Sequence, residues 1–154
     1  RDPYASGTTT GTGDPVVSGV QRGVALQVDN DTLLGFTMTG GSISDFQKNA
    51  TVFNRADLNV TGVTITGGGD QPINAQNGIQ VLNSTGTIAN NIITKIGYAG
   101  PAVAYSGMIL GFGNTDLDIT GNTITGTNGV NTASKVVGIF ILDFGPDNNG
   151  GSIT

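Results

Sequence analysis

Three aspartates have the spacing that comes nearest to a metal site. Asp116 and Asp118 stand two residues apart among β-branched residues, so on a strand both side chains share one face. Asp57 opens the segment 57–66, which repeats the pattern of 116–125. Carboxylate oxygens grouped in this way are ligands that Ca²⁺ prefers. The interpretation that we favour is that these aspartates are solvated at the starts of strands and that the chain binds no cofactor.

The sequence contains few residues that could carry out other catalytic chemistry. The chain has no His and no Cys, which excludes an imidazole base, a Ser-His or Cys-His pair and a disulfide framework. It also has no Trp and only three Tyr. Hydrolases that cleave sugar chains need clustered carboxylates, and no such cluster is visible in the sequence. We therefore predict that the chain is not an enzyme, with a site completed by further sequence as the open alternative.

Threonines recur as Thr-x-Thr pairs. On a strand both members of a pair point outward on one face, and stacked strands would align the pairs in rows. Such rows resemble an ice-binding face, but we favour a solvated sheet of residues with high β propensity. The pairs are Thr37 and Thr39, Thr64 and Thr66, and Thr123 and Thr125.

A second outward column is less polar. Gln80, Ile109 and Phe140 each follow an apolar residue that the alternating pattern places inward. An apolar outward column either lies beneath a covering segment or contacts another molecule. Together with the threonine rows, these three residues are the binding or assembly face that the sequence predicts.

All these residues belong to two motifs that repeat in phase. Both motifs advance by roughly 27 to 31 residues per copy, and two motifs with one period indicate a solenoid. In a solenoid each coil covers the apolar row of the next, which no coil can bury alone. The first motif begins at Gly78, Gly107 and Gly138; the second fills 57–66, 87–94 and 116–125, with an earlier copy at 33–39.

Composition supports a β-rich fold and excludes two kinds of partner. Only 11% of the residues are charged, and the 26 Gly together with many Thr and Asn suit strands and turns better than helices. The net charge is −5 and the six basic residues are scattered, whereas nucleic-acid binding needs basic clusters. No apolar run reaches the roughly 18 residues of a membrane span.

The stretch 119–125 reads Ile-Thr-Gly-Asn-Thr-Ile-Thr, and Asn91 holds the place of Asn122 one coil earlier. This pattern resembles the right-handed parallel β-helix superfamily, which contains pectate lyases, polygalacturonases, alginate epimerases and many surface proteins. The segment 77–91 is similar to repeats of large bacterial extracellular proteins. The resemblance implies an all-β, right-handed parallel β-helix of about five coils. It also implies an inward asparagine ladder of Asn91 and Asn122, interrupted by Phe36 and Val63 in the earlier coils.

We expect residues 1–19 to form an extended lead-in or cap and residues 20–154 to form the β-helix. The acidic, Lys-poor, Cys-free composition is typical of bacterial secreted and surface proteins. The predicted function is a non-enzymatic extracellular module of an adhesin, a matrix protein or a filament. Its expected partners are other copies, other extracellular proteins or polysaccharide. The alternatives are a polysaccharide-binding or polysaccharide-active β-helix of the lyase or epimerase kind, and an ice-binding protein.

Overall fold

The computed structural model describes residues 23–70, 75–99, 105–113, 116–127, 135–142 and 150–154. Within these ranges the chain forms twelve strands and no helix. The strands are β1 (Val24–Thr39), β2 (Ser42–Ser44), β3 (Asn49–Thr61), β4 (Thr64–Gly69), β5 (Asn77–Leu82), β6 (Thr85–Ala89), β7 (Ile92–Ile96), β8 (Tyr105–Phe112), β9 (Asp116–Thr120), β10 (Thr123–Gly126), β11 (Lys135–Leu142) and β12 (Gly150–Ile153).

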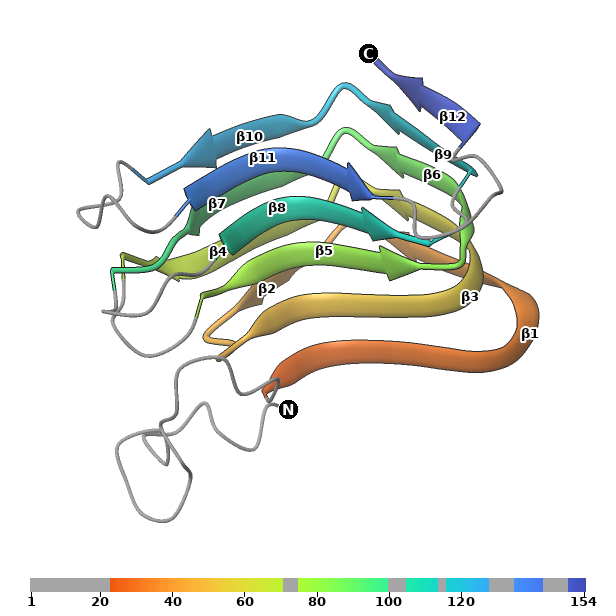
Figure 1. The fold of residues 1–154 in the computed structure, drawn as a ribbon, viewed down its shortest axis with the longest axis horizontal. Helices are drawn as coiled ribbons and strands as arrows, with labels where there is room; N and C mark the ends of the chain where they lie inside the picture. Colours follow the sequence, from red (N-terminus) through yellow and green to blue (C-terminus); the bar gives the residue numbers. More distant parts are fainter. Residues whose placement is uncertain (1–22, 71–74, 100–104, 114–115, 128–134, 143–149) are drawn as a thin grey trace.

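The strands wind into a parallel β-solenoid with three faces, stacked from β1 to β12 (Figure 1). The first face contains the first halves of β1 and β3, followed by β5, β8 and β11. The second face contains the second halves of β1 and β3, followed by β6, β9 and β12. The third face is a separate sheet of β2, β4, β7 and β10. Every pairing is parallel, because each turn of the chain passes the three faces in the same order.

The predicted fold class is confirmed: the described chain is all β, and its strands stack as a parallel solenoid. The structure has about four turns where the sequence indicates about five. The difference arises because the third face contains four strands, so the passes through the first and second faces outnumber the closed turns.

Columns of apolar side chains fill the interior from turn to turn. On the third face Ile43, Ile65, Ile93 and Ile124 occupy one column. Ile65 and Ile93 lie in the middle turns and are 0% exposed, whereas Ile43 and Ile124 are partly buried. Full burial of such a side chain contributes about 1.5–3 kcal/mol. Each turn therefore depends on both neighbours for the burial that stabilises it.

The bend between the second and third faces uses one backbone conformation in every turn. Gly40, Gly62, Asn90 and Gly121 have φ values of 67°, 69°, 54° and 62°. This left-handed region is freely open to Gly, and Asn tolerates it better than most residues. The bend therefore selects these two residue types, and it places the corner at the same point of each turn.

In two of the turns the residue after this bend is an asparagine, and these two residues form the predicted asparagine ladder. Asn91 is fully buried, and its Nδ2 donates to Asn122 Oδ1 over 2.9 Å and to the Val60 carbonyl over 2.9 Å. Its Oδ1 accepts the backbone N–H of Val63 over 2.8 Å. The ladder of Asn91 and Asn122 is confirmed, and Val63 takes the equivalent place in the earlier turn.

The first turn is shorter than the sequence pattern indicates. Ser42 pairs with Thr64, a step of 22 residues in place of the predicted 27. The prediction that Phe36 stands in the ladder position is therefore wrong, since Phe36 pairs with Leu58 on the second face. The alternating apolar residues of β1 imitate the repeated motif, and this similarity shifts the alignment by five residues.

The proposed boundary after residue 19 lies outside the described residues. Among the residues that are described, no helix is long and apolar enough to cross a membrane.

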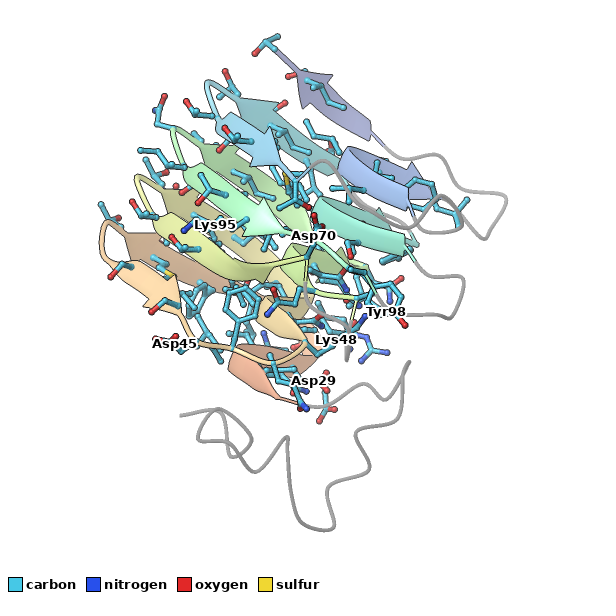
Figure 2. All side chains as sticks on the ribbon, turned by 90° about the vertical axis from the view of Figure 1, so that its left-hand side faces the viewer. Asp29, Asp45, Lys48, Asp70, Lys95 and Tyr98 are labelled. Atoms are coloured by element: carbon cyan, nitrogen blue, oxygen red, sulfur yellow. The ribbon has the colours of Figure 1, made fainter. Side chains whose placement is uncertain are left out.

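Figure 2 looks onto another side of the solenoid, where Asp45, Asp70 and Lys95 lie apart from one another. Charge is therefore dispersed over this side.

Candidate functional site

The three aspartates do not come together in the structure. Asp57 and Asp116 share a column on the second face, but Thr85 lies between them. Two strand spacings separate them by about 10 Å, whereas one Ca²⁺ needs oxygen ligands within about 2.6 Å. Asp118 instead accepts a hydrogen bond from the Ser152 hydroxyl over 2.8 Å. Among the described residues no group of three or more acidic, His or Cys side chains could hold a metal ion.

The threonine rows lie on the third face, with one correction. Thr64 and Thr66 align with Thr123 and Thr125 through β7, where Ile92 interrupts one of the two rows. The prediction that Thr37 and Thr39 belong to these rows is wrong: they pair with Asn59 and Thr61 on the second face. Ser42 and Ser44 stand in the rows where Thr37 and Thr39 were expected, because the step from β2 to β4 is five residues shorter than predicted.

The less polar outward column also needs a correction. Gln80 pairs with Leu110 and Phe140 pairs with Leu110, so Leu110 is the middle member of the column. The placement of Ile109 on the outside is wrong, since Ile109 is 0% exposed. Met108 before it also belongs to the core, so two consecutive side chains in the middle of β8 are buried. Simple alternation is thus broken within β8, although its register with β5 and β11 stays constant.

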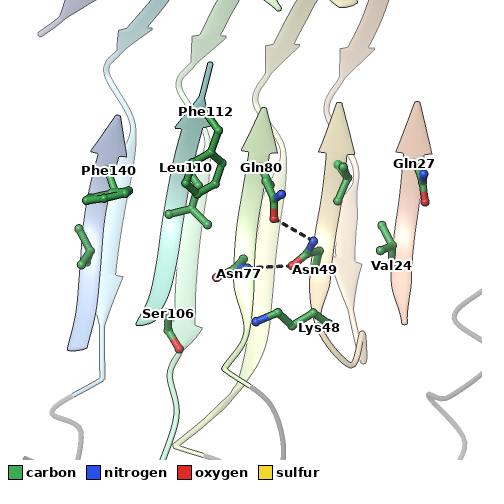
Figure 3. Close-up of a pocket in the computed structure, with 12 residues that line it drawn as sticks. Val24, Gln27, Lys48, Asn49, Asn77, Gln80, Ser106, Leu110, Phe112 and Phe140 are labelled. Carbon is green, nitrogen blue, oxygen red and sulfur yellow. Dashed lines mark hydrogen bonds between the residues drawn. The ribbon is translucent and has the colours of Figure 1, made fainter. Parts of the chain in front are cut away.

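This outward column forms the floor of a groove on the first face (Figure 3). Its volume is about 710 Å³, within the roughly 300–1,000 Å³ range of ligand sites. Six of the lining residues are polar and six are apolar, and most of the lining surface is apolar. The polar residues are Gln27, Lys48, Asn49, Asn77, Gln80 and Ser106; the apolar ones are Val24, Val52, Leu110, Phe112, Val137 and Phe140.

A chain of side-chain amides crosses the groove from strand to strand. Asn77 Nδ2 donates to Asn49 Oδ1 over 3.0 Å, and Asn49 Nδ2 donates to Gln80 Oε1 over 3.1 Å (Figure 3). Asn77 Oδ1 accepts the backbone N–H of Gly107 over 3.1 Å. Because these amides hold one another, the polar half of the groove has a fixed orientation.

Lys48 and Ser106 lie at the same end of the groove, near the start of β5. Lys48 is 4% exposed, and its ammonium donates to the carbonyl of Ala75. Burial lowers the pKa of Lys48 to about 8. Ser106 is 0% exposed, and its hydroxyl has no hydrogen-bond partner among the described residues. This end of the groove thus contains a buried cation and an unsatisfied hydroxyl.

Aromatic side chains line the other part of the groove. Phe112 and Phe140 meet edge to face with ring centroids 6.1 Å apart, a favourable geometry for two aromatic rings. Phe140 is 38% exposed, and Leu142 beyond it on β11 is 37% exposed. These side chains leave an accessible apolar surface beside Leu110.

Sequence reasoning finds Gln80 and Phe140 in this groove but misses Lys48, Asn49, Asn77 and Ser106. A usable signal exists, because Asn49 and Asn77 each precede a small residue and then a buried strand residue. The alignment of Gly107 with Gly78 hides this signal in β8, because Gly107 stacks beside Asn77 and Met108 beside Gly78. Comparison of the chain with protein-family models, curated proteins and solved structures gives no match. A function for this groove must therefore be inferred from its geometry.

Proposed function

We propose that this chain is a non-enzymatic structural module that works outside the cell. It would form a rigid segment of a surface adhesin, a matrix protein or a self-associating filament. The observation that supports this is the continuity of the stacked columns: the apolar rows and the bend positions recur in register from turn to turn. The asparagine ladder adds hydrogen bonds between two of the turns. In such an array stability is built from contacts between neighbouring turns, so a rod can be extended by adding turns.

The edges of the described solenoid suit association. β12 pairs with β9 on one side, and its residue Ile153 is 58% exposed. An exposed edge strand offers unpaired backbone groups, and proteins that avoid association usually place charged side chains there. The residues of β12 are Gly150, Gly151, Ser152 and Ile153, none of which is charged.

Sedimentation velocity combined with negative-stain microscopy tests this proposal. We expect ordered assemblies that grow with protein concentration, and we expect Ile153→Lys to abolish them by placing a charge on the edge. Asn59→Lys is the matched control, since Asn59 is exposed in the middle of the second face. Monomers alone at high concentration would contradict the self-associating form of the proposal, as would equal loss in both variants.

Polysaccharide binding is a second candidate function. The amide chain of Asn49, Asn77 and Gln80 favours it, because ordered amides are good partners for sugar hydroxyls. A glycan array with and without Ca²⁺, repeated with Asn77→Ala, tests the idea. Binding that is lost in the variant supports it, and the absence of any binding under both conditions removes it.

A further inference from the structure

The polar end of the groove contains hydrogen-bond donors that have no acceptor among the described residues. The Oδ1 atoms of Asn49 and Asn77 and the Oε1 of Gln80 already accept hydrogen bonds from within the protein. The Ser106 hydroxyl has no partner among the described residues, and the Lys48 ammonium carries three N–H groups, one of which meets the Ala75 carbonyl. A ligand that enters this end therefore meets donors and a positive charge.

A buried ammonium that has no counter-charge among the described residues is a costly arrangement. Removing a charge from water is expensive unless an opposite charge or several hydrogen bonds compensate for it. Burial is the cause of the lowered pKa of Lys48, and Lys48 is the one titratable residue among the twelve that line the groove. A carboxylate placed beside it would supply the missing charge, and the Ser106 hydroxyl would donate a second hydrogen bond to it.

The rest of the groove is apolar, so a ligand that fills the whole groove needs an apolar part as well as a polar one. Leu110, Phe112 and Phe140 lie next to one another on β8 and β11, away from the Lys48 end of the groove (Figure 3). They carry no polar side-chain atom that could bind a hydroxyl group. An alkyl chain or aromatic ring against them would bury apolar surface, which favours binding by about 25 cal/mol per Å².

We propose that this groove is a binding site for a small amphiphilic carboxylate, such as a medium-chain fatty acid. Its carboxylate would pair with Lys48 and Ser106, and its apolar body would lie against Leu110, Phe112 and Phe140. This site is separate from the structural role proposed above. It also differs from the polysaccharide candidate, because a neutral sugar chain would leave the Lys48 charge without a partner.

Isothermal titration calorimetry with octanoate at neutral pH tests the site. We expect saturable binding, about tenfold weaker for Lys48→Gln because a charge-assisted hydrogen bond is lost. Lys95→Gln is the matched control, since Lys95 is exposed and lies outside the groove. Affinity should rise about twofold for each CH₂ added from butanoate to octanoate, which is less than full burial would give because the groove is open.

Further binding measurements distinguish this proposal from the alternatives of apolar binding alone and of polysaccharide binding. Octanol should bind much more weakly than octanoate, and Ser106→Ala should weaken octanoate about threefold even if Lys48→Gln fails to fold. Equal binding of octanol and octanoate, an equal loss in Lys95→Gln, or no binding of octanoate overturns the proposal. If neutral oligosaccharides bind and octanoate does not, the polysaccharide candidate stands in its place. None of these results depends on whether the chain self-associates.

Discussion

Asn77 and Asn49 lie on neighbouring parallel strands, and the Nδ2 of Asn77 donates to the Oδ1 of Asn49 over 3.0 Å. Both residues line the groove although they are only 5% and 3% exposed. The strand register that stacks like residues in the core thus also aligns polar residues on the outer face. The columns of this solenoid have consequences for its stability, its pH response and its surface.

The asparagine ladder should contribute strongly to stability. Asn91→Ala removes the side-chain partners of the Val63 N–H and the Val60 carbonyl, which lie in the buried interior. Asn122 Oδ1 keeps the backbone N–H of residue 91. We expect the free energy of unfolding to fall by about 2–4 kcal/mol. Urea denaturation followed by circular dichroism measures this change. The control Asn59→Ala removes one exposed hydrogen bond and should change stability by less than about 0.5 kcal/mol; similar losses in the two variants would contradict the ladder.

Gly86 should tolerate no side chain. Its φ is 114°, and a Cβ there would lie 2.0 Å from the Leu58 carbonyl oxygen on the neighbouring strand. Gly86→Ala should therefore destabilise the fold by more than about 3 kcal/mol, measured by the same denaturation. The matched variant Gly35→Ala adds a Cβ that meets nothing within 4 Å, so its stability should be near that of the parent chain. Native stability of Gly86→Ala would rule out this close approach of strands.

Lys48 should make stability rise at alkaline pH. Its pKa is about 8 in the folded chain and 10.5 when unperturbed, so between these values the unfolded chain binds more protons. The free energy of unfolding therefore increases as pH rises through this window, by up to about 3 kcal/mol. The difference between the parent chain and Lys48→Met isolates this effect from the other titrating groups. A difference that stays flat or falls from pH 8 to pH 10 would contradict the buried ammonium.

The third face should not bind ice. Ile92 breaks one of the two hydroxyl rows, and Ser42 and Ser44 lack the methyl groups that the threonines of the later turns carry. We expect no thermal hysteresis at millimolar concentration in nanolitre osmometry. A measurable hysteresis that disappears in Thr64→Tyr would reverse this conclusion and assign the rows an ice-binding role.

The later turns could be predicted from sequence because their motifs are nearly identical. The segments beginning at Asp57 and Asp116 align residue by residue, and the structure stacks them through Thr85 as expected. The ladder of Asn91 and Asn122 could be predicted because this motif resembles that of known parallel β-helices. The physical constraint and the sequence pattern agree in this part of the chain.

Two features could not be predicted from the sequence. From the second half of β1 onward the first turn advances by only 22 residues, and the alternating apolar residues of β1 resemble the repeated motif at another register. In β8 Met108 and not Gly107 stacks beside Gly78, so the alignment of the glycines shifts the register by one residue and places Ile109 on the wrong side. Lys48 and Ser106 reach the same end of the groove through the registers of β3 with β5 and of β5 with β8, which bring residues 58 positions apart to two strands from each other.

The register of the stacked turns is the central claim, since the columns and the groove depend on it. The chain has no Cys, so pairs of introduced cysteines report on it directly. Ser44→Cys with Thr66→Cys should form a disulfide under mild oxidation, because these residues are neighbours across β2 and β4, where Cα atoms lie about 4.8 Å apart. Thr39→Cys with Thr66→Cys, which the sequence alignment alone would pair, should stay reduced because Thr39 lies on the second face. Mass spectrometry that finds the disulfide in the first pair alone supports the account, and a disulfide in the second pair alone would contradict it.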